Sequence, residues 1–336
     1  MIIDLRSDTV TKPTSGMMDA MFNAKVGDDV FGEDPSVNML QEKTASIFGH
    51  EAGLFCSSGT MTNQLAIKTH TRPGDEIIAS SMSHIYLFEG GGVAANSGVS
   101  IKMIEGDRGR LTVDGIRELI NPDDAHFPRT KMVCLEDTMN KGGGAIYDLE
   151  EIKRIRKFCN VNNLILHLDG ARVFNSLVET GIDPVEYGSY FDSISICFSK
   201  GLGCPVGSVL IGKKDFIYQA HRYRKTFGGG MRQAGYLAAA GLYALENNIE
   251  RLKEDHSRAK KIGDLFDNHP LVESVVPVKT NIVILNLKSG IDSADVVVKF
   301  KSKNLLVTSF GPTKIRFVTH LDFDDDQLEE VKSRVI

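Results

Sequence analysis

Residues 164–172 read LILHLDGAR, an apolar run that ends in an acid, a glycine, an alanine and a base. Such a run predicts a β-strand covered on both faces, as in parallel sheets. Because side chains alternate along a strand, His167 and Asp169 share one face and Leu168 lies on the other. Ligands of open α/β sheets bind beyond the carboxyl ends of the strands, which is where Asp169 emerges. A helix cap at Asp169, paired with Arg172, explains the segment equally well.

Similar apolar runs alternate with amphipathic stretches through the first two thirds of the chain. Strands are expected at Gly53–Cys56, Glu76–Ala79, Ile101–Ile104, Lys131–Glu136, Leu164–Leu168, Ser193–Cys197 and Ser208–Ile211. Helices are expected at Val37–Phe48, Thr62–Thr71, Val113–Ile120, Leu149–Cys159 and Pro184–Tyr190. This alternation predicts an α/β fold with a mostly parallel, doubly wound sheet.

The pattern changes after residue 230, where two long helices are expected at Met231–Asn247 and Glu250–Asn268. Strands at Ile282–Leu287, Leu305–Thr308 and Ile315–Val318, with a helix at Ala294–Lys303, complete the chain. We therefore expect a large domain at residues 1–245 and a small α+β C-terminal domain at residues 246–336.

The composition excludes several classes of protein. The 39 basic and 44 acidic residues give a net charge of −5, without the basic excess of a nucleic-acid binder. No apolar run approaches the roughly 20 residues that span a bilayer. Charged residues stand near the N-terminus where a signal peptide is apolar, so a cytoplasmic protein is expected. The five cysteines form no CxxC pair, so neither a metal site nor a disulfide framework is indicated.

A lysine follows the apolar run at residues 193–197, in the sequence SKGLG at 199–203. Most lysines are solvated surface residues, and taken alone Lys200 would be one of them. A lysine between two buried strands is instead partly desolvated and can act as an amine nucleophile. The nearby glycines do not form a dinucleotide-binding loop, because their spacing is GxGxxxG and a strand follows them.

Two further segments suggest a site for an anion. Residues 57–60, SSGT, enter a predicted helix whose N-terminus can hold a phosphate, although simple N-capping by Ser58 or Thr60 explains them too. Residues 222–232 carry basic side chains on both sides of three glycines, which fits either an anion site or a solvated helix end. A phosphate cradle, a carboxylate and a lysine amine together match pyridoxal phosphate, with its phosphate, pyridine nitrogen and aldehyde.

Six ordered motifs resemble the low-specificity L-threonine aldolases, which are fold-type-I pyridoxal-phosphate enzymes. The motifs are DLRSDTVT at 4–11, GDDVFGEDP at 27–35, SGTM at 58–61, HLDGAR at 167–172, SKGLG at 199–203 and GGGMRQ at 228–233. The resemblance implies a homotetramer built of tight dimers, with active sites at subunit interfaces and residues 1–15 near the active site.

The resemblance also implies a role for each candidate residue. Lys200 matches the lysine that binds the cofactor covalently, and Asp169 matches the partner of the pyridine nitrogen. The remaining cofactor contacts implied are Ser58, Gly59, Thr60, His84, Arg172, Lys225 and Arg232, with Lys225 and Arg232 reaching from a neighbouring subunit. The substrate contacts implied are Ser7, Arg172, Arg316 and His126. Without the resemblance, His84 and His126 would be taken for surface or structural histidines.

The implied reaction is retro-aldol cleavage of L-threonine or L-allo-threonine to glycine and acetaldehyde, with His84 or His126 as the base for the β-hydroxyl. Another pyridoxal-phosphate activity, such as that of a β-eliminating lyase or an amino-acid racemase, is the alternative. Intact Lys200 and Asp169 argue against a non-catalytic binding protein. Two segments depart from the family pattern. Phe31 stands where tyrosine is common, and EDTMN at 136–140, with Asp137 and Met139, stands where ENTHN is common.

Overall fold

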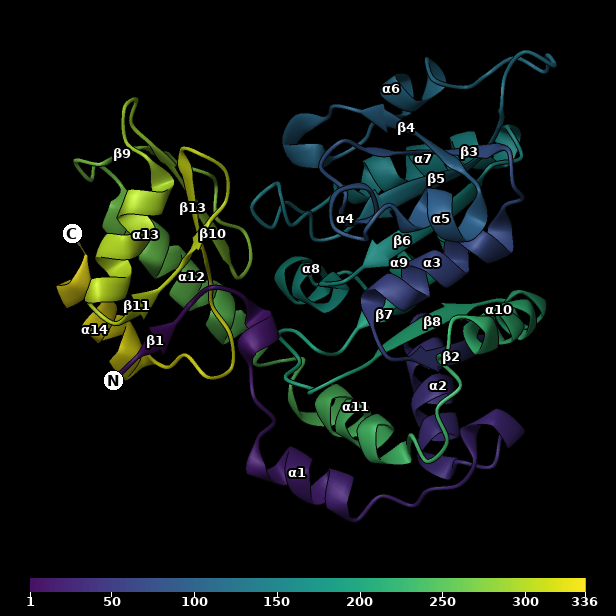
Figure 1. Cartoon of the computed structure of the whole chain (residues 1–336), viewed down its shortest axis with the longest axis horizontal. Helices are drawn as coiled ribbons and strands as arrows, with labels where there is room; N and C mark the ends of the chain where they lie inside the picture. Colours follow the sequence, from purple (N-terminus) through teal and green to yellow (C-terminus); the bar gives the residue numbers. More distant parts are fainter. Residues whose placement is uncertain (336) are drawn as a thin grey trace.

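The computed structural model describes residues 1–335 and is built around a seven-stranded sheet. The strand order is β2-β8-β7-β6-β5-β3-β4, and β8 alone runs against its neighbours. The strands are β2 (Ala52–Cys56), β3 (Asp75–Ser80), β4 (Ser100–Ile104), β5 (Arg129–Glu136), β6 (Ile165–Gly170), β7 (Ser193–Cys197) and β8 (Ser208–Gly212). The predicted mostly parallel α/β sheet is confirmed, and each predicted strand overlaps an observed one (Figure 1).

Helices cover both faces of this sheet, because its strands are apolar on both sides. One face packs against α2 (Pro35–Ile47), α7 (Leu149–Val161), α8 (Val173–Thr180) and α11 (Gly235–Asn247). The other face packs against α3 (Gly59–His70), α5 (Gly92–Ser97) and α10 (Lys214–Thr226). Along β6, Leu168 joins the first core, whereas His167 and Asp169 face α3, as the strand period predicts.

The C-terminal part forms a second core around an antiparallel sheet of order β12-β13-β10-β9. Its strands are β9 (Val272–Val275), β10 (Ile282–Leu287), β12 (Thr308–Ser309) and β13 (Lys314–Val318), and its helices are α12 (Leu252–Phe266), α13 (Ser293–Ser302) and α14 (Asp325–Arg334). Strand β1 (Ile3–Asp4) pairs in parallel with β11 (Leu305–Leu306). Ile3 and Leu5 belong to this second core, so the N-terminal residues, predicted with residues 1–245, pack with the C-terminal part (Figure 1).

Several predicted boundaries move and some helices were not predicted. The helix expected from Met231 begins at Gly235, and the strand expected at Leu305–Thr308 is divided between β11 and β12 in two sheets. The unpredicted helices include α1 (Ser15–Phe22), α4 (His84–Leu87), α5, α8 and α10; the short helices α6 (Val113–Arg117) and α9 (Pro184–Gly188) were predicted longer. Within the described chain, no helix has both the length and the apolar composition that crossing a bilayer requires. All five cysteines are free and buried.

Candidate active site

Lys200 lies in the loop that joins β7 to β8, at the carboxyl end of β7. Its side chain is half-buried, and residues 1–335 offer its Nζ no hydrogen bond or ion pair. Its charge nevertheless acts on two neighbours, since it contributes to the low pKa of Asp8 and partly opposes the rise in the pKa of His84. The amine is therefore placed among charged groups without being fixed to any of them, as a nucleophilic lysine requires.

Asp169 ends β6 and is buried, with each carboxylate oxygen held by a different donor. Its Oδ2 accepts from Nδ2 of Asn63 on α3 at 2.9 Å, and its Oδ1 accepts from the backbone N–H of Ala171 at 3.1 Å. The ion pair with Arg172 that the sequence left open is wrong, because Arg172 pairs with Asp8. Asp169 is thus a fixed, buried carboxylate at the carboxyl end of a central strand.

His84, at the start of α4, joins this cluster through Glu89. Its Nδ1 lies 2.9 Å from Oε1 of Glu89, and the same oxygen accepts from Nδ2 of Asn63, also at 2.9 Å. His84, Glu89 and Asp169 thereby bring ligand-type atoms within 4.8 Å of one another. Burial alone would lower the pKa of His84, but the hydrogen bond to Glu89 and the charges of Asp169 and Glu89 raise it above the ordinary value.

A second buried glutamate, Glu136, lies at the end of β5 beside Asp169. Its two oxygens accept from the backbone N–H groups of His84, at 2.7 Å, and Asn140, at 2.9 Å. Burial, together with the charge of Asp169, raises the pKa of Glu136 to about 7. Glu136 therefore connects the segments that carry His84 and Asn140 to the sheet.

The expected phosphate cradle is the N-terminus of α3. The Ser58 hydroxyl caps the helix by accepting from the N–H of Met61 at 3.2 Å, so the capping interpretation is confirmed for Ser58. The backbone N–H groups of Gly59 and Thr60 precede the first intrahelical bond, and they have no protein acceptor within the described chain. These free amides, at the positive end of the helix dipole, are the donors that hold a phosphate.

The two arginines expected at the substrate carboxylate come from different parts of the chain. Arg172, just before α8, is buried and forms a bidentate pair with Asp8, with Nε–Oδ2 at 2.8 Å and Nη2–Oδ1 at 2.7 Å. Arg316, on β13, donates from Nη1 to Oδ1 of Asn140 at 2.9 Å. Ser7 caps the turn at Asp8–Val10, its Oγ accepting from the N–H of Thr9 at 3.3 Å. Because Arg316 donates to Asn140, the C-terminal part contacts the loop that follows β5 of the large sheet.

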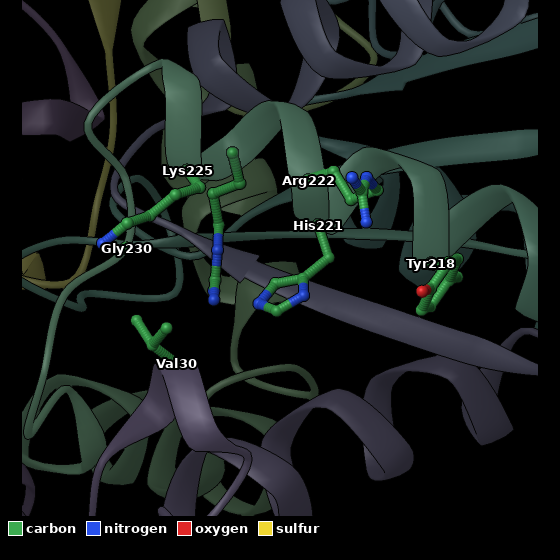
Figure 2. A pocket seen from close by; sticks show the side chains of 7 residues that line it. Val30, Tyr218, His221, Arg222, Lys225 and Gly230 are labelled. Atoms are coloured by element: carbon green, nitrogen blue, oxygen red, sulfur yellow. The ribbon is translucent and has the colours of Figure 1, made fainter.

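Lys225 and Arg232 lie on a different surface, which we call the basic loop face and define by Val30, Phe31, Lys225, Gly230 and Arg232. Arg232 pairs with Asp28 at 3.1 Å, and Lys225 is exposed. Figure 2 shows Val30, Lys225 and Gly230 around a pocket of about 370 Å³. Lys200 and Asp169 are not among the residues that line it.

His126 is also apart from Lys200 within one chain. Its side chain is 88% exposed on the loop before β5, and its Nδ1 lies 2.7 Å from Oδ1 of Asp124. Met139 is buried and lies close to Gly109 and Gly142, while its neighbour Asn140 contacts Arg316. The structure thus brings together Lys200, Asp169, His84, Arg172 and Arg316, and leaves His126, Lys225 and Arg232 on the surface.

Sequence reasoning missed two residues that organise this cluster, Asn63 and Glu89. The amide of Asn63 donates to both Glu89 and Asp169, and its Oδ1 lies 3.3 Å from Nε2 of His167. A single polar residue on a helix gives no signal in a sequence. Its position on the face of α3 that covers β6 could be recognised only once the two elements were known to pack.

The residues present fit pyridoxal phosphate. Asp169 offers a fixed carboxylate for a pyridine N–H, Lys200 offers an unpaired amine for an aldehyde, and the free amides of Gly59 and Thr60 offer donors for a phosphate. His84 presents its ring beside Asp169. In addition, the hydroxyl of Ser208 is buried near Gly59 without a hydrogen-bond partner in residues 1–335, which leaves an unsatisfied polar atom next to the cradle.

Comparison with known proteins supports the same assignment. The family model of β-eliminating lyases matches residues 4–289. The low-specificity L-threonine aldolase of Escherichia coli K12 is 44% identical over 332 residues, covering 98% of this chain and 97% of that protein. The enzyme of the same name from Saccharomyces cerevisiae is 39% identical over 335 residues, covering 98% of this chain and 84% of the yeast protein.

A solved structure shows the same fold at low sequence identity. Threonine aldolase of Leishmania major has a TM-score of 0.84 and 19% identity, and the match covers 99% of both chains. The fold-type-I prediction is therefore confirmed. With these matches along nearly its whole length, the chain belongs to the low-specificity L-threonine aldolase group of the β-eliminating lyase family, whose enzymes depend on pyridoxal 5′-phosphate.

Proposed function

We propose that this chain cleaves L-threonine and L-allo-threonine to glycine and acetaldehyde. The observation that carries the proposal is the convergence of Lys200, Asp169 and His84 with two arginines from different parts of the chain. When bound, pyridoxal phosphate supplies an electron sink that accepts the electron pair left at Cα after the Cα–Cβ bond breaks.

The protein orients the substrate through its carboxylate. Arg172 and Arg316 bind the two carboxylate oxygens, which fixes the rotation about the bond from the amine to Cα. The carboxylate of Asp169, fixed by Asn63 and Ala171, holds a proton at the pyridine nitrogen. Lys200 provides the amine that would hold the aldehyde of the cofactor until the amine of the substrate replaces it.

His84 removes the proton of the β-hydroxyl, directly or through water. Its Nδ1 is bonded to Glu89, so the free lone pair of the neutral ring lies on Nε2. His126 is the competing base, and in that case it acts on the site of a neighbouring subunit, since it is exposed on its own chain.

We further propose a homotetramer of tight dimers with active sites at subunit interfaces, as the family resemblance implies, and this division of the residues supports a shared site. In it, Lys225 and Arg232 of one subunit reach the phosphate held by Gly59 and Thr60 of its neighbour. The five buried free thiols support a reducing, cytoplasmic location, where the reaction produces glycine from threonine.

A product assay of the purified holoenzyme tests the activity. We expect glycine and acetaldehyde in equal amounts from L-threonine and from L-allo-threonine. Pyruvate and ammonia from L-serine, without acetaldehyde from threonine, would instead identify a β-eliminating lyase. Interconversion of L- and D-amino acids without cleavage would identify a racemase.

A further inference from the structure

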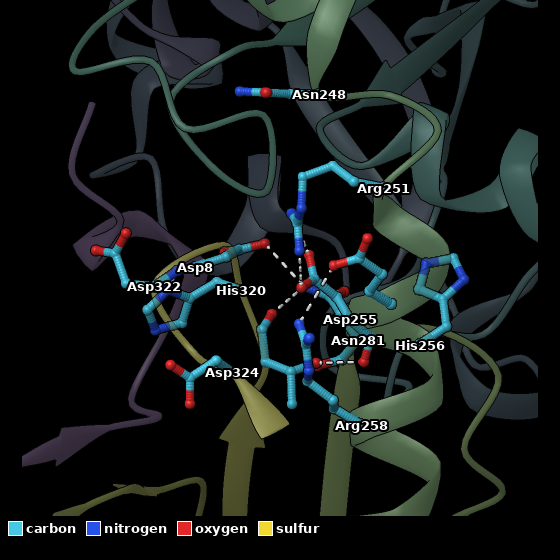
Figure 3. Close-up of polar contacts among 12 residues, drawn as sticks. Asp8, Asn248, Arg251, Asp255, His256, Arg258, Asn281, His320, Asp322 and Asp324 are labelled. Atoms are coloured by element: carbon cyan, nitrogen blue, oxygen red, sulfur yellow. Dashed lines mark hydrogen bonds and ion pairs between the residues drawn. The ribbon is translucent and has the colours of Figure 1, made fainter. Parts of the chain in front are cut away.

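Asp8 is a fully buried carboxylate beside the candidate site, and the proposed reaction gives it no role. Its Oδ1 accepts from Nη2 of Arg172 at 2.7 Å, and its Oδ2 accepts from Nε of Arg172 at 2.8 Å. Oδ2 also accepts from Nδ2 of Asn281 at 3.1 Å (Figure 3). Burial alone would raise the pKa of Asp8, but Arg172, Lys200 and Asn281 hold it well below its usual range, so the carboxylate remains charged.

Asp8 lies where the two parts of the molecule meet. Arg172 precedes α8 of the large sheet, whereas Asn281 precedes β10 of the C-terminal part. The segment that carries Asp8 is fixed to the C-terminal part, since Leu5 accepts from the N–H of Val318 at 2.9 Å. The C-terminal part therefore determines where Asp8 lies, and Asp8 determines how Arg172 is oriented.

Each of the two arginines keeps N–H donors for a ligand, since a guanidinium carries five and each forms two hydrogen bonds in the described chain. Asp8 occupies Nε and Nη2 of Arg172, and within residues 1–335 its Nη1 has no hydrogen-bond partner. Arg316 donates from Nη1 to Asn140 and from Nη2 to the carbonyl of Arg6, while its buried Nε has no partner in the described chain.

The two cations also repel each other. Burial lowers the pKa of Arg316 to about 10, and the positive charge of Arg172 contributes to this decrease. Asp8 is the carboxylate that neutralises Arg172 when no ligand is bound. A buried arginine pair without a counter-charge would be costly, so Asp8 keeps both donors in place before the substrate arrives.

We propose that Asp8 is a positioning residue that orients Arg172, so that Nη1 of Arg172 and the free N–H groups of Arg316 meet the carboxylate of an amino-acid ligand. This inference rests on the proposed function to the extent that the ligand is an amino acid. It adds a residue that does not touch the substrate but determines how tightly the carboxylate is held.

Glycine binding to the holoenzyme tests the proposal without turnover, through the change in the visible absorption of the cofactor. Asp8→Asn, Arg172→Lys and the double variant are compared with wild type, and Asp4→Asn is the matched control in the same segment. We expect Asp8→Asn to raise the Kd for glycine by about tenfold or more, because a charge-assisted bidentate contact is lost. The double variant should be at most about threefold weaker than Arg172→Lys, because both changes act on one interaction.

The proposal is overturned if Asp8→Asn binds glycine within about threefold of wild type, or if the two losses multiply in the double variant. Should Asp8→Asn not fold, Asp8→Glu keeps the charge and displaces it by one methylene; an unchanged Kd for that variant also overturns the proposal. A holoenzyme that binds glycine normally but does not cleave threonine contradicts the proposed function and leaves this test valid.

Discussion

Two regions of the molecule carry the residues of the proposed site, and they differ in how they are held. Lys200, Asp169, His84, Arg172 and Arg316 converge within one chain, supported by buried partners such as Asn63 and Asp8. The basic loop face is exposed, and its only ion pair within the described chain is between Arg232 and Asp28. In a shared active site, each chain supplies only some of the residues, and this division of residues fits such a site.

The largest expected effect comes from Lys200, because its unpaired amine is the proposed nucleophile of the converged region. Lys200→Ala should lose nearly all cleavage of threonine, while the phosphate cradle at α3 still binds the cofactor. Borohydride treatment of wild type, followed by peptide mapping, checks the assignment. Labelling of a peptide that contains a different lysine contradicts it.

Mixing variants sharpens the comparison between the two regions. Lys200→Ala and Lys225→Ala each disable a site, but a hybrid dimer contains one site with both lysines intact if Lys225 acts across the interface. Random mixing should then restore about a quarter of wild-type activity under limiting cofactor. No recovery after unfolding and refolding the mixture, with wild type refolded in parallel as control, would place both lysines in one chain's site.

His84 and His126 extend the comparison to the base, since one lies in the converged region and the other is exposed. His84→Ala should lower kcat by roughly 10²–10⁴-fold, the usual contribution of a general base. Because Glu89 raises the pKa of His84, kcat/KM of wild type should fall on the acid side at a pH above the ordinary histidine value.

His126→Ala is the matched control for this prediction. A larger loss in His126→Ala than in His84→Ala would assign the base to the exposed loop. If both variants stay within about tenfold of wild type, a water or the cofactor phosphate is the proton acceptor.

Asp169→Asn tests the carboxylate at the centre of the converged region. Asn keeps the bonds to Asn63 and Ala171 in part but removes the charge that holds a proton at the pyridine nitrogen. The loss of an oriented electrostatic contribution of this kind is about 3–4 kcal/mol, or 10²–10³-fold in kcat. Steady-state kinetics with a cofactor titration check it, and a rate within threefold of wild type would contradict the role.

From the residues alone, the convergence could be predicted only where strand periodicity applies, whereas His84, Arg172 and Arg316 were expected there from the family resemblance. The apolar runs of β5, β6 and β7 indicate buried parallel strands, and alternation places His167 and Asp169 on one face. The pairing of Arg172 with Asp8 was not accessible, because it joins residues 164 positions apart through packing that the sequence does not specify. Helix α10 was missed since only Ile217, Ala220 and Arg224 of its thirteen residues are buried.

The reversal of β8 was not predicted, although the short connection from β7 indicates it. The connection between β7 and β8 carries Lys200 and no helix, and the strand that follows pairs antiparallel with β7. An alternation of strands and helices predicts parallel neighbours, but a parallel crossover needs a dozen or more residues and usually a helix, so this short connection favours an antiparallel pair. The reversal of β8 matters for function, because the non-helical connection leaves Lys200 at the open end of the sheet.

Asp137 lies beneath the converged region. Its substitution is expected to have a smaller effect, on the stability of the protein instead of on its rate. Burial raises the pKa of Asp137 to about 7, although the Tyr187 hydroxyl donates to its Oδ2 at 2.5 Å. The folded protein therefore binds a proton that the unfolded chain releases, so the free energy of unfolding decreases as pH rises from about 4 to about 7. Asp137→Asn should gain stability relative to wild type at pH 8 and less at pH 5.

Denaturant unfolding of both proteins at the two pH values measures this difference. Asp267→Asn, at an exposed position after α12, is the control and should show no pH-dependent difference. A stability difference that is equal at both pH values would mean that Asp137 is ionised throughout this range.

The smallest expected effect belongs to Phe31, on the basic loop face. Its ring is 73% exposed in one chain, and its backbone N–H donates to Oδ1 of Asp28 at 3.3 Å. If the face completes a neighbouring site, Phe31→Tyr adds a hydroxyl near the substrate. One neutral hydrogen bond is worth about 0.5–1.5 kcal/mol, so kcat/KM should change by at most roughly tenfold.

Comparing kcat/KM for L-threonine and for L-allo-threonine tests this prediction more sharply than the rate with one substrate does. A hydroxyl near Cβ interacts differently with threonine and allo-threonine, so Phe31→Tyr should shift the ratio of their kcat/KM values. Tyr218→Phe is the matched control, because Tyr218 is an exposed aromatic residue that lines a pocket with Phe31. Unchanged rates and an unchanged ratio for Phe31→Tyr would mean that this ring only packs at the interface, and the basic loop face would then contribute cations but no selectivity.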